Sequence, residues 1–146
     1  MKPDPGQARF IYDDGGRAAA GFKGTAGDCV TRAVAIATGS PYREVYDALN
    51  ESCTDPKSCA RNGVRKPDVR RHLTSLGWKW TPTMTIGSGC KVHLRADELP
   101  PGRLVVRVSK HLVTVIDGVL HDTHDCSRGG TRCVYGYWSK PDGATA

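Results

Sequence analysis

Two segments far apart in the chain carry residues that could act together as a nucleophile, a base and an orienting acid. Cys29 lies in the first segment, and His111 and Asp122 lie in the second. A thiolate attacks carbonyl carbons, an imidazole moves the proton, and a neighbouring carboxylate fixes the tautomer of the imidazole and stabilises its protonated form. These residue types therefore point to chemistry at an amide or thioester, provided that the fold brings them together.

The second segment, residues 109–124, predicts a β-hairpin. Asp117-Gly118 separates two short runs that are rich in β-branched residues, which is a strong signal for a two-residue turn. Because side chains alternate along a strand, this turn puts His111 and Asp122 on one side of the hairpin as diagonal neighbours, about 7–8 Å apart at the backbone. If the hairpin carries a bulge, Asp125 or Asp117 takes the place of Asp122.

The first segment, residues 24–39, predicts a short helix with Cys29 in its first turn. Its apolar residues recur at i, i+3, i+4 and i+7, the spacing of a buried stripe (Val30, Ala33, Val34 and Ala37). Asp28 suits the N-cap and Gly39 suits the end of the helix. The unpaired amides and the positive dipole end favour a thiolate at Cys29. The carboxylate of Asp28 opposes this effect, so the thiolate needs an imidazolium nearby.

The rest of the pattern places helices first and strands second. Further helices are expected after Ser40-Pro41 and from Pro67-Asp68 to Gly77, and further strands at 9–12, 78–81, 103–108 and 133–138. The runs 103–108 and 111–116 form either a tight antiparallel pair or one bent strand. This order is typical of an α+β fold.

The 146 residues are enough for one domain with its own core, over 1–146, with a less ordered arm at 1–23 and tail at 139–146. No apolar run approaches the roughly 20 residues of a membrane span, and the N-terminus lacks the apolar stretch of a secretory signal. We therefore expect a cytoplasmic protein, although export without a signal peptide stays compatible with the sequence. The net charge of +6 comes from scattered basic residues, which disfavours a nucleic-acid partner.

The main rival site is a zinc cluster in one short segment (His121, His124, Cys126 and Cys133). The hairpin sends its two histidines to opposite faces, and six residues separate the two cysteines, which is wider than in usual zinc knuckles. We therefore expect no metal and no other cofactor.

The other cysteines offer a rival nucleophile and two small disulfide loops. Cys90 follows a glycine-rich loop but lacks a helix behind it. Cys126 with Cys133, and Cys53 with Cys59, could each close a short loop in an oxidising compartment. In a reducing cytosol all six cysteines would be thiols, metal ligands or a nucleophile.

The motifs Asp28-Cys29 at the head of a helix and His111-Leu112-Val113-Thr114-Val115 followed by Asp122 resemble the papain-like cysteine peptidase superfamily, over roughly residues 24–138. The similarity is greatest to small bacteriocin-leader peptidases and cell-wall amidases. It implies a helical lobe packed on an antiparallel sheet and a protein or peptide substrate. It also implies that Cys29 is the nucleophile, that His111 is the general base and that Asp122 orients His111.

Papain-like enzymes commonly place a glutamine just before the nucleophile to hold the oxyanion, and here the chain departs from the pattern. Its one glutamine is Gln7, and Lys23 occupies the corresponding stretch, so the oxyanion candidates are Gln7, Lys23 and Asp28 with the adjoining amide. A missing oxyanion donor costs about 2.7–4 kcal/mol of transition-state stabilisation. The alternatives to an enzyme are thus an inactive papain-like binding module, or a zinc-stabilised protein that binds nucleic acid or protein.

Overall fold

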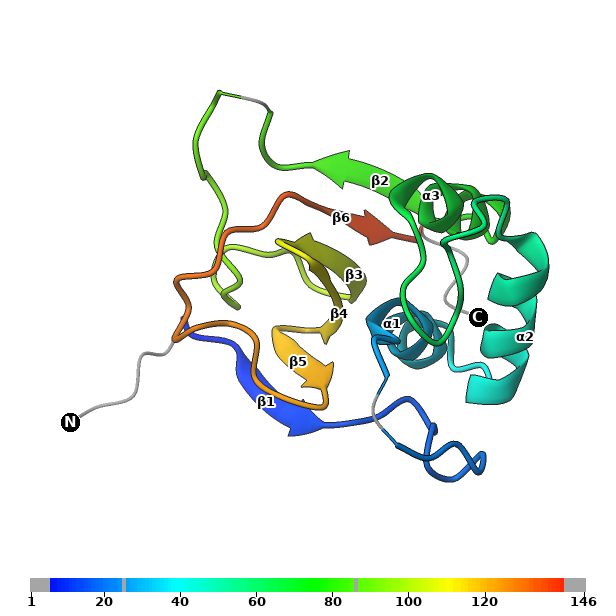
Figure 1. The fold of residues 1–146 in the computed structure, drawn as a ribbon. Helices are drawn as coiled ribbons and strands as arrows, with labels where there is room; N and C mark the ends of the chain where they lie inside the picture. The colour runs from blue at the N-terminus through cyan, green and yellow to red at the C-terminus, as the bar shows by residue number, and fades with distance from the viewer. Residues whose placement is uncertain (1–5, 25, 86, 141–146) are drawn as a thin grey trace.

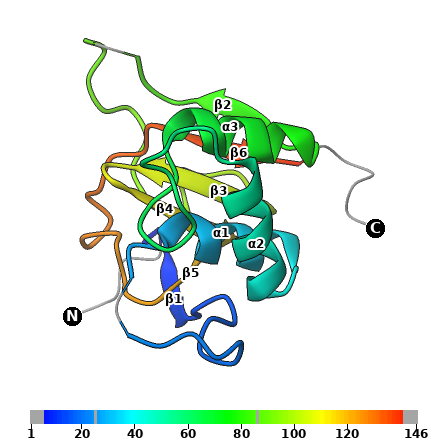
Figure 2. The ribbon, with the colours of Figure 1, turned by 45° about the vertical axis from the view of Figure 1, so that its right-hand side comes forward.

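The structure, a computed structural model, describes residues 6–24, 26–85 and 87–140 as three helices and a six-stranded mixed sheet. The helices are α1 (Cys29–Thr38), α2 (Tyr42–Ser52) and α3 (Lys66–Ser75). The strands are β1 (Arg9–Tyr12), β2 (Lys79–Pro82), β3 (Arg103–Val108), β4 (His111–Ile116), β5 (Val119–Asp122) and β6 (Gly136–Ser139). The helices gather on one side of the sheet (Figure 1), and α1 lies between α2 and the sheet (Figure 2). The α+β class is therefore confirmed.

The ends of the helices follow from local sequence, with two differences from prediction. Gly39 ends α1 with a φ of 71°, and its N–H donates to the carbonyl oxygen of Ala35. Pro41 takes the N-cap position of α2, so this helix begins one residue later than Ser40-Pro41 predicted. Asp28 is the N-cap residue of α1, as predicted, but its side chain makes no capping hydrogen bond. Its carboxylate is bound by other side chains instead.

The strands run in the order β1-β5-β4-β3-β6-β2. Asp117 and Gly118 both have positive φ, as a tight hairpin turn requires, and Ile116 pairs with Val119 in the predicted register. The strands β3 and β4 form a tight antiparallel pair rather than one bent strand. The expected all-antiparallel sheet is wrong, because β1 pairs in parallel with β5 at the edge. The helices separate β1 from β5 along the chain, and a long connection of this kind permits parallel pairing.

Apolar residues are buried on both faces of the sheet. One cluster joins the helices to the sheet (Val34, Leu49, Leu73, Val105, Leu112 and Trp138 among its members). The other lies on the opposite face (Leu94, Val106, Val113, Val115, Leu120 and Val134 among its members). The central strands therefore read as continuous apolar runs. Among the described residues, no helix has the length and apolar character needed to cross a membrane.

A disulfide between Cys90 and Cys133 ties the 83–101 loop to the segment before β6. Cys90 is therefore not a thiol nucleophile, and the proposed pairing of Cys126 with Cys133 is wrong. Cys53 and Cys59 are both free. Because a disulfide is more typical of oxidising compartments than of cytosol, the cytoplasmic location stays an untested prediction.

Candidate active site

Cys29, His111 and Asp122 meet at the open end of the β4–β5 hairpin. Cys29 is the first residue of α1, His111 the first of β4 and Asp122 the last of β5. Helix α1 is fixed on the sheet where Thr114 Oγ1 donates to the carbonyl oxygen of Ala33 at 2.6 Å. This packing brings the start of the helix to the two strand ends, so the fold joins the two segments that are far apart in the sequence.

The carboxylate of Asp122 holds the ring of His111 in place. His111 Nε2 donates to Asp122 Oδ2 at 2.6 Å. The other oxygen, Oδ1, accepts from the backbone N–H of Thr123 at 2.7 Å and from Arg32 Nη2 at 3.3 Å. Asp122 is only 3% exposed, so these contacts form out of water, where charge-assisted hydrogen bonds are strong.

Asp117 and Asp125, the two possible substitutes for Asp122, bind elsewhere. Asp117 Oδ1 accepts from the N–H of Gly102, and Asp125 Oδ1 accepts from the N–H and the hydroxyl of Ser127. The structure therefore places Asp122 beside His111, as the regular hairpin register predicts.

The thiol of Cys29 is free and half-buried, and its pKa responds to the ring of His111. Burial alone would raise its pKa, but the hydrogen bond and charge of His111, with the N–H of Leu112, bring the pKa below its ordinary value of 9.0. The charge of Arg32 acts in the same direction. These are the surroundings in which a cysteine ionises and becomes nucleophilic.

The pKa of the His111 imidazole is shifted in the opposite direction, upward. Burial lowers its pKa, but hydrogen bonds to Asp122 and to the thiols of Cys126 and Cys29 raise the pKa to about 11. A lowered thiol pKa beside a raised imidazole pKa favours a thiolate–imidazolium pair at neutral pH. The pair is coupled, so each charge stabilises the other.

A second buried carboxylate, Asp28, lies directly before the nucleophile and is 2% exposed. It accepts from Tyr42 Oη at 2.5 Å, pairs with Arg17 Nε at 3.3 Å and forms a short ion pair with Arg32 Nη1. Burial and this carboxylate raise the pKa of Tyr42. Both carboxylate oxygens of Asp28 are bound by these partners. The adjoining backbone amide is therefore the oxyanion donor that remains at this position.

Arg32 is the residue that sequence reasoning missed. Its guanidinium bridges Asp28 and Asp122, and so connects the residue before the nucleophile to the residue that orients the base. A signal was present, because an arginine stands one turn after Asp28 in a helix otherwise composed of small and apolar residues. A buried arginine needs acidic partners, and two are available here.

The structure does not bring Gln7 or Lys23 to the thiol. Tyr12 pairs with Asp122, whereas Arg9 pairs with Val119 beside the hairpin turn, so Gln7, which precedes β1, lies past the end of the hairpin opposite to the site. Lys23 is exposed, and its backbone carbonyl accepts from Arg17. The remaining oxyanion donors are the first-turn amides of α1, including that of Cys29, since no side chain caps this helix end.

Two of the four residues of the rival zinc cluster are committed elsewhere. His121 Nδ1 lies 3.7 Å from a carboxylate oxygen of Asp13, and Cys133 forms the disulfide with Cys90. The rival cluster of His121, His124, Cys126 and Cys133 is therefore not assembled.

A different set of possible metal ligands lies at the candidate active site. One ligand atom each from His111, Asp122 and His124 lies within 4.8 Å of the others, and the two imidazole rings are 5.4 Å apart. Two imidazoles and a carboxylate suit a transition metal. These residues could bind such an ion only if the direct hydrogen bond between His111 and Asp122 were broken and the ion lay between the two side chains.

A scan against protein-family models, a search of curated proteins and a search of solved structures each returned no match for this chain. Functional assignment therefore depends on the site itself.

Proposed function

We propose that this protein is a thiol-dependent hydrolase of papain-like type, a peptidase, isopeptidase or amidase that acts on an amide or thioester. The observation that carries the proposal is the 2.6 Å hydrogen bond between the ring of His111 and the buried carboxylate of Asp122, together with the lowering of the pKa of the Cys29 thiol by His111. The pKa values of the thiol and the imidazole are shifted toward the charged pair, as this chemistry requires.

In the proposed reaction the Cys29 thiolate attacks the carbonyl carbon, and the electron pair of the carbonyl moves to its oxygen. The first-turn amides of α1 stabilise this oxyanion, and their fixed positive dipole end adds to the effect. His111 then protonates the leaving amine or thiol as the oxyanion collapses, which leaves an acyl group on Cys29. Water attacks this acyl group and gives a proton to His111, and Cys29 leaves as the thiolate.

Acyl transfer to Cys29 tests the proposal. We would incubate the protein with the thiobenzyl ester of N-acetylglycine, quench in acid and locate the acyl group by peptide mass spectrometry. We expect acylation at Cys29 and several equivalents of N-acetylglycine per protein molecule, with both lost in Cys29→Ala and strongly reduced in His111→Ala. Asp47→Asn is the matched control, because Asp47 is an exposed residue of α2 whose carboxylate pairs with Arg43 and with no residue of this site.

Cys53 is an internal reference in the same experiment, because burial and the charge of Asp68 raise the pKa of its thiol. Equal acylation of Cys29 and Cys53 without turnover would contradict the proposal and favour the inactive binding module. Turnover that is lost in EDTA and restored by zinc would favour a metal site at His111, Asp122 and His124.

A further inference from the structure

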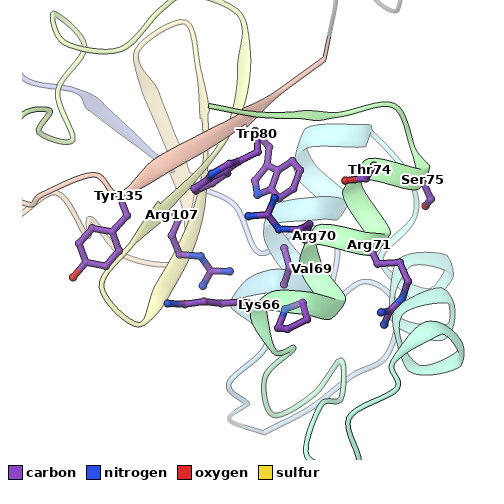
Figure 3. Close-up of a pocket in the computed structure, with 11 residues that line it drawn as sticks. Lys66, Val69, Arg70, Arg71, Thr74, Ser75, Trp80, Arg107 and Tyr135 are labelled. Atoms are coloured by element: carbon purple, nitrogen blue, oxygen red, sulfur yellow. The ribbon is translucent and has the colours of Figure 1, made fainter. Parts of the chain in front are cut away.

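A basic cavity of about 730 Å³ opens between α3 and the sheet. Its lining includes four cationic side chains and two indole rings (Lys66, Arg70, Arg71, Arg107, Trp80 and Trp138). Figure 3 shows Arg70 and Arg107 directed into this space from α3 and β3, with the end of Lys66 nearby. The volume lies in the range of sites that hold small ligands or one to two side chains of a peptide.

Three of these four cations, Lys66, Arg70 and Arg107, have no acidic partner among the described residues. Arg71, the next residue of α3, shows the contrast: it is directed away from Arg70 in Figure 3 and pairs with the buried carboxylate of Asp68. Arg107 is half-buried, and burial lowers its pKa, which shows that its charge is partly removed from water. Like charges that face one cavity repel one another, and a bound anion would relieve that repulsion.

The cavity also offers flat apolar surfaces beside the charges. The guanidinium of Arg70 lies over the ring of Trp138 at 5.8 Å, and the rings of Trp80 and Trp138 are 5.3 Å apart. Gly136 makes this arrangement possible, because a Cβ at this position would lie 2.3 Å from a ring atom of Trp80. A guanidinium fork held against an indole suits a carboxylate that carries an apolar flank.

The cavity is connected to the candidate active site through β3 and β4. Arg107 on β3 pairs with Leu112, which directly follows His111 on β4. Burial lowers the pKa of Arg107, and the charge of Cys29 opposes this lowering. One molecule can therefore place a carbonyl at Cys29 and a side group in the cavity.

We propose that this cavity is a specificity pocket that binds a carboxylate-bearing, apolar-flanked part of the substrate, as in an acidic peptide. Lys66, Arg70 and Arg107 hold the carboxylate, and the indoles pack on the flank. The proposal deepens the proposed function and rests on it for the reaction, but binding can be measured without any turnover.

The test compares two ligands that differ by one charge, N-acetyl-Phe-Glu-amide and N-acetyl-Phe-Gln-amide, by calorimetry on the Cys29→Ala protein. Loss of a charge-assisted hydrogen bond weakens binding by about 10-fold or more, so we expect the Glu ligand to bind at least that much more tightly. Arg70→Gln and Lys66→Gln, both at exposed positions, should each reduce this preference. Lys79→Gln is the matched control, because Lys79 precedes Trp80 on β2 and points to the other face.

Equal binding of the two ligands, or a preference that Arg70→Gln and Lys66→Gln leave unchanged, would overturn the specificity pocket. Tighter binding of phenyl phosphate than of the Glu ligand would overturn the assignment to a carboxylate. A clear preference for Glu in a protein whose Cys29 is never acylated would contradict the hydrolase and leave the pocket standing. Acylation of Cys29 at equal rates by the thioesters of the Glu and Gln ligands would contradict the specificity pocket and leave the hydrolase standing.

Discussion

Replacement of Asp122 by asparagine keeps the size of the side chain and removes the charge between His111 and Arg32. Each of the two contacts, at 2.6 Å and 3.3 Å, is a charge-assisted hydrogen bond worth about 1.5–3 kcal/mol. Removal of one partner of a buried ion pair costs about 3–5 kcal/mol. The amide oxygen can still accept one of the two bonds, so we expect the free energy of unfolding to fall by about 3 kcal/mol at neutral pH.

Urea unfolding measures this loss, and the rate of Cys29 alkylation measures its effect on the site. Without the carboxylate, the pKa of His111 falls from about 11, the thiolate loses support and alkylation near pH 6 slows. The pKa of Asp122 lies below 3.8 in the folded protein. The difference in free energy of unfolding between wild type and Asp122→Asn should therefore reach its full value above that pH and shrink as the pH falls. The control Asp47→Asn breaks an exposed ion pair with Arg43 and should lower the free energy of unfolding by less than about 1 kcal/mol.

A loss below about 1 kcal/mol in Asp122→Asn, with an unchanged alkylation rate, would refute this reasoning. It would mean that the carboxylate neither stabilises the fold nor acts on the imidazole.

Three further measurements follow from particular contacts. Because its pKa is raised from 6.5 to about 11, His111 stabilises the fold fully below pH 6.5 and loses this effect as the pH rises toward 11. The difference in free energy of unfolding between wild type and His111→Ala should therefore shrink between about pH 6 and 10, and a constant difference would contradict the shift. The Cys90–Cys133 disulfide joins residues with a sequence separation of 43, so its reduction should lower the free energy of unfolding by up to about 4 kcal/mol. Dithiothreitol should therefore lower the urea midpoint, and an unchanged midpoint would contradict this linkage. Gly136→Ala should lower the free energy of unfolding by about 1–3 kcal/mol, because the added methyl group overpacks against the indole of Trp80, and it should alter the tryptophan fluorescence. An unchanged spectrum and urea midpoint would contradict this close packing.

The sequence was sufficient where structure depends on near neighbours. The turn at Asp117-Gly118 fixes the hairpin register, and with it the contact between His111 and Asp122. The spacing of apolar residues and Gly39 define α1, which puts Cys29 in a first turn. The proximity of the two segments was a prediction from resemblance, because no local pattern determines which strand a helix packs against.

The sequence was insufficient where structure depends on distant partners. The parallel pairing of β1 with β5 and the disulfide between Cys90 and Cys133 both join segments that only the complete fold brings together. Asp28 has the right residue type for an N-cap, but Arg17 and Tyr42 lie close enough to bind its carboxylate instead. Tertiary contacts of this kind override local preference.

The most direct test of the central claim is the rate of iodoacetamide modification of each free cysteine near pH 6, followed by peptide mass spectrometry. An ordinary thiol is almost fully protonated at this pH and reacts slowly. We expect Cys29 to react well ahead of Cys53, Cys59 and Cys126, and His111→Ala to remove that lead. Modification of Cys29 at the rate of the other thiols, or a lead that persists without His111, would contradict a thiolate–imidazolium pair at this site.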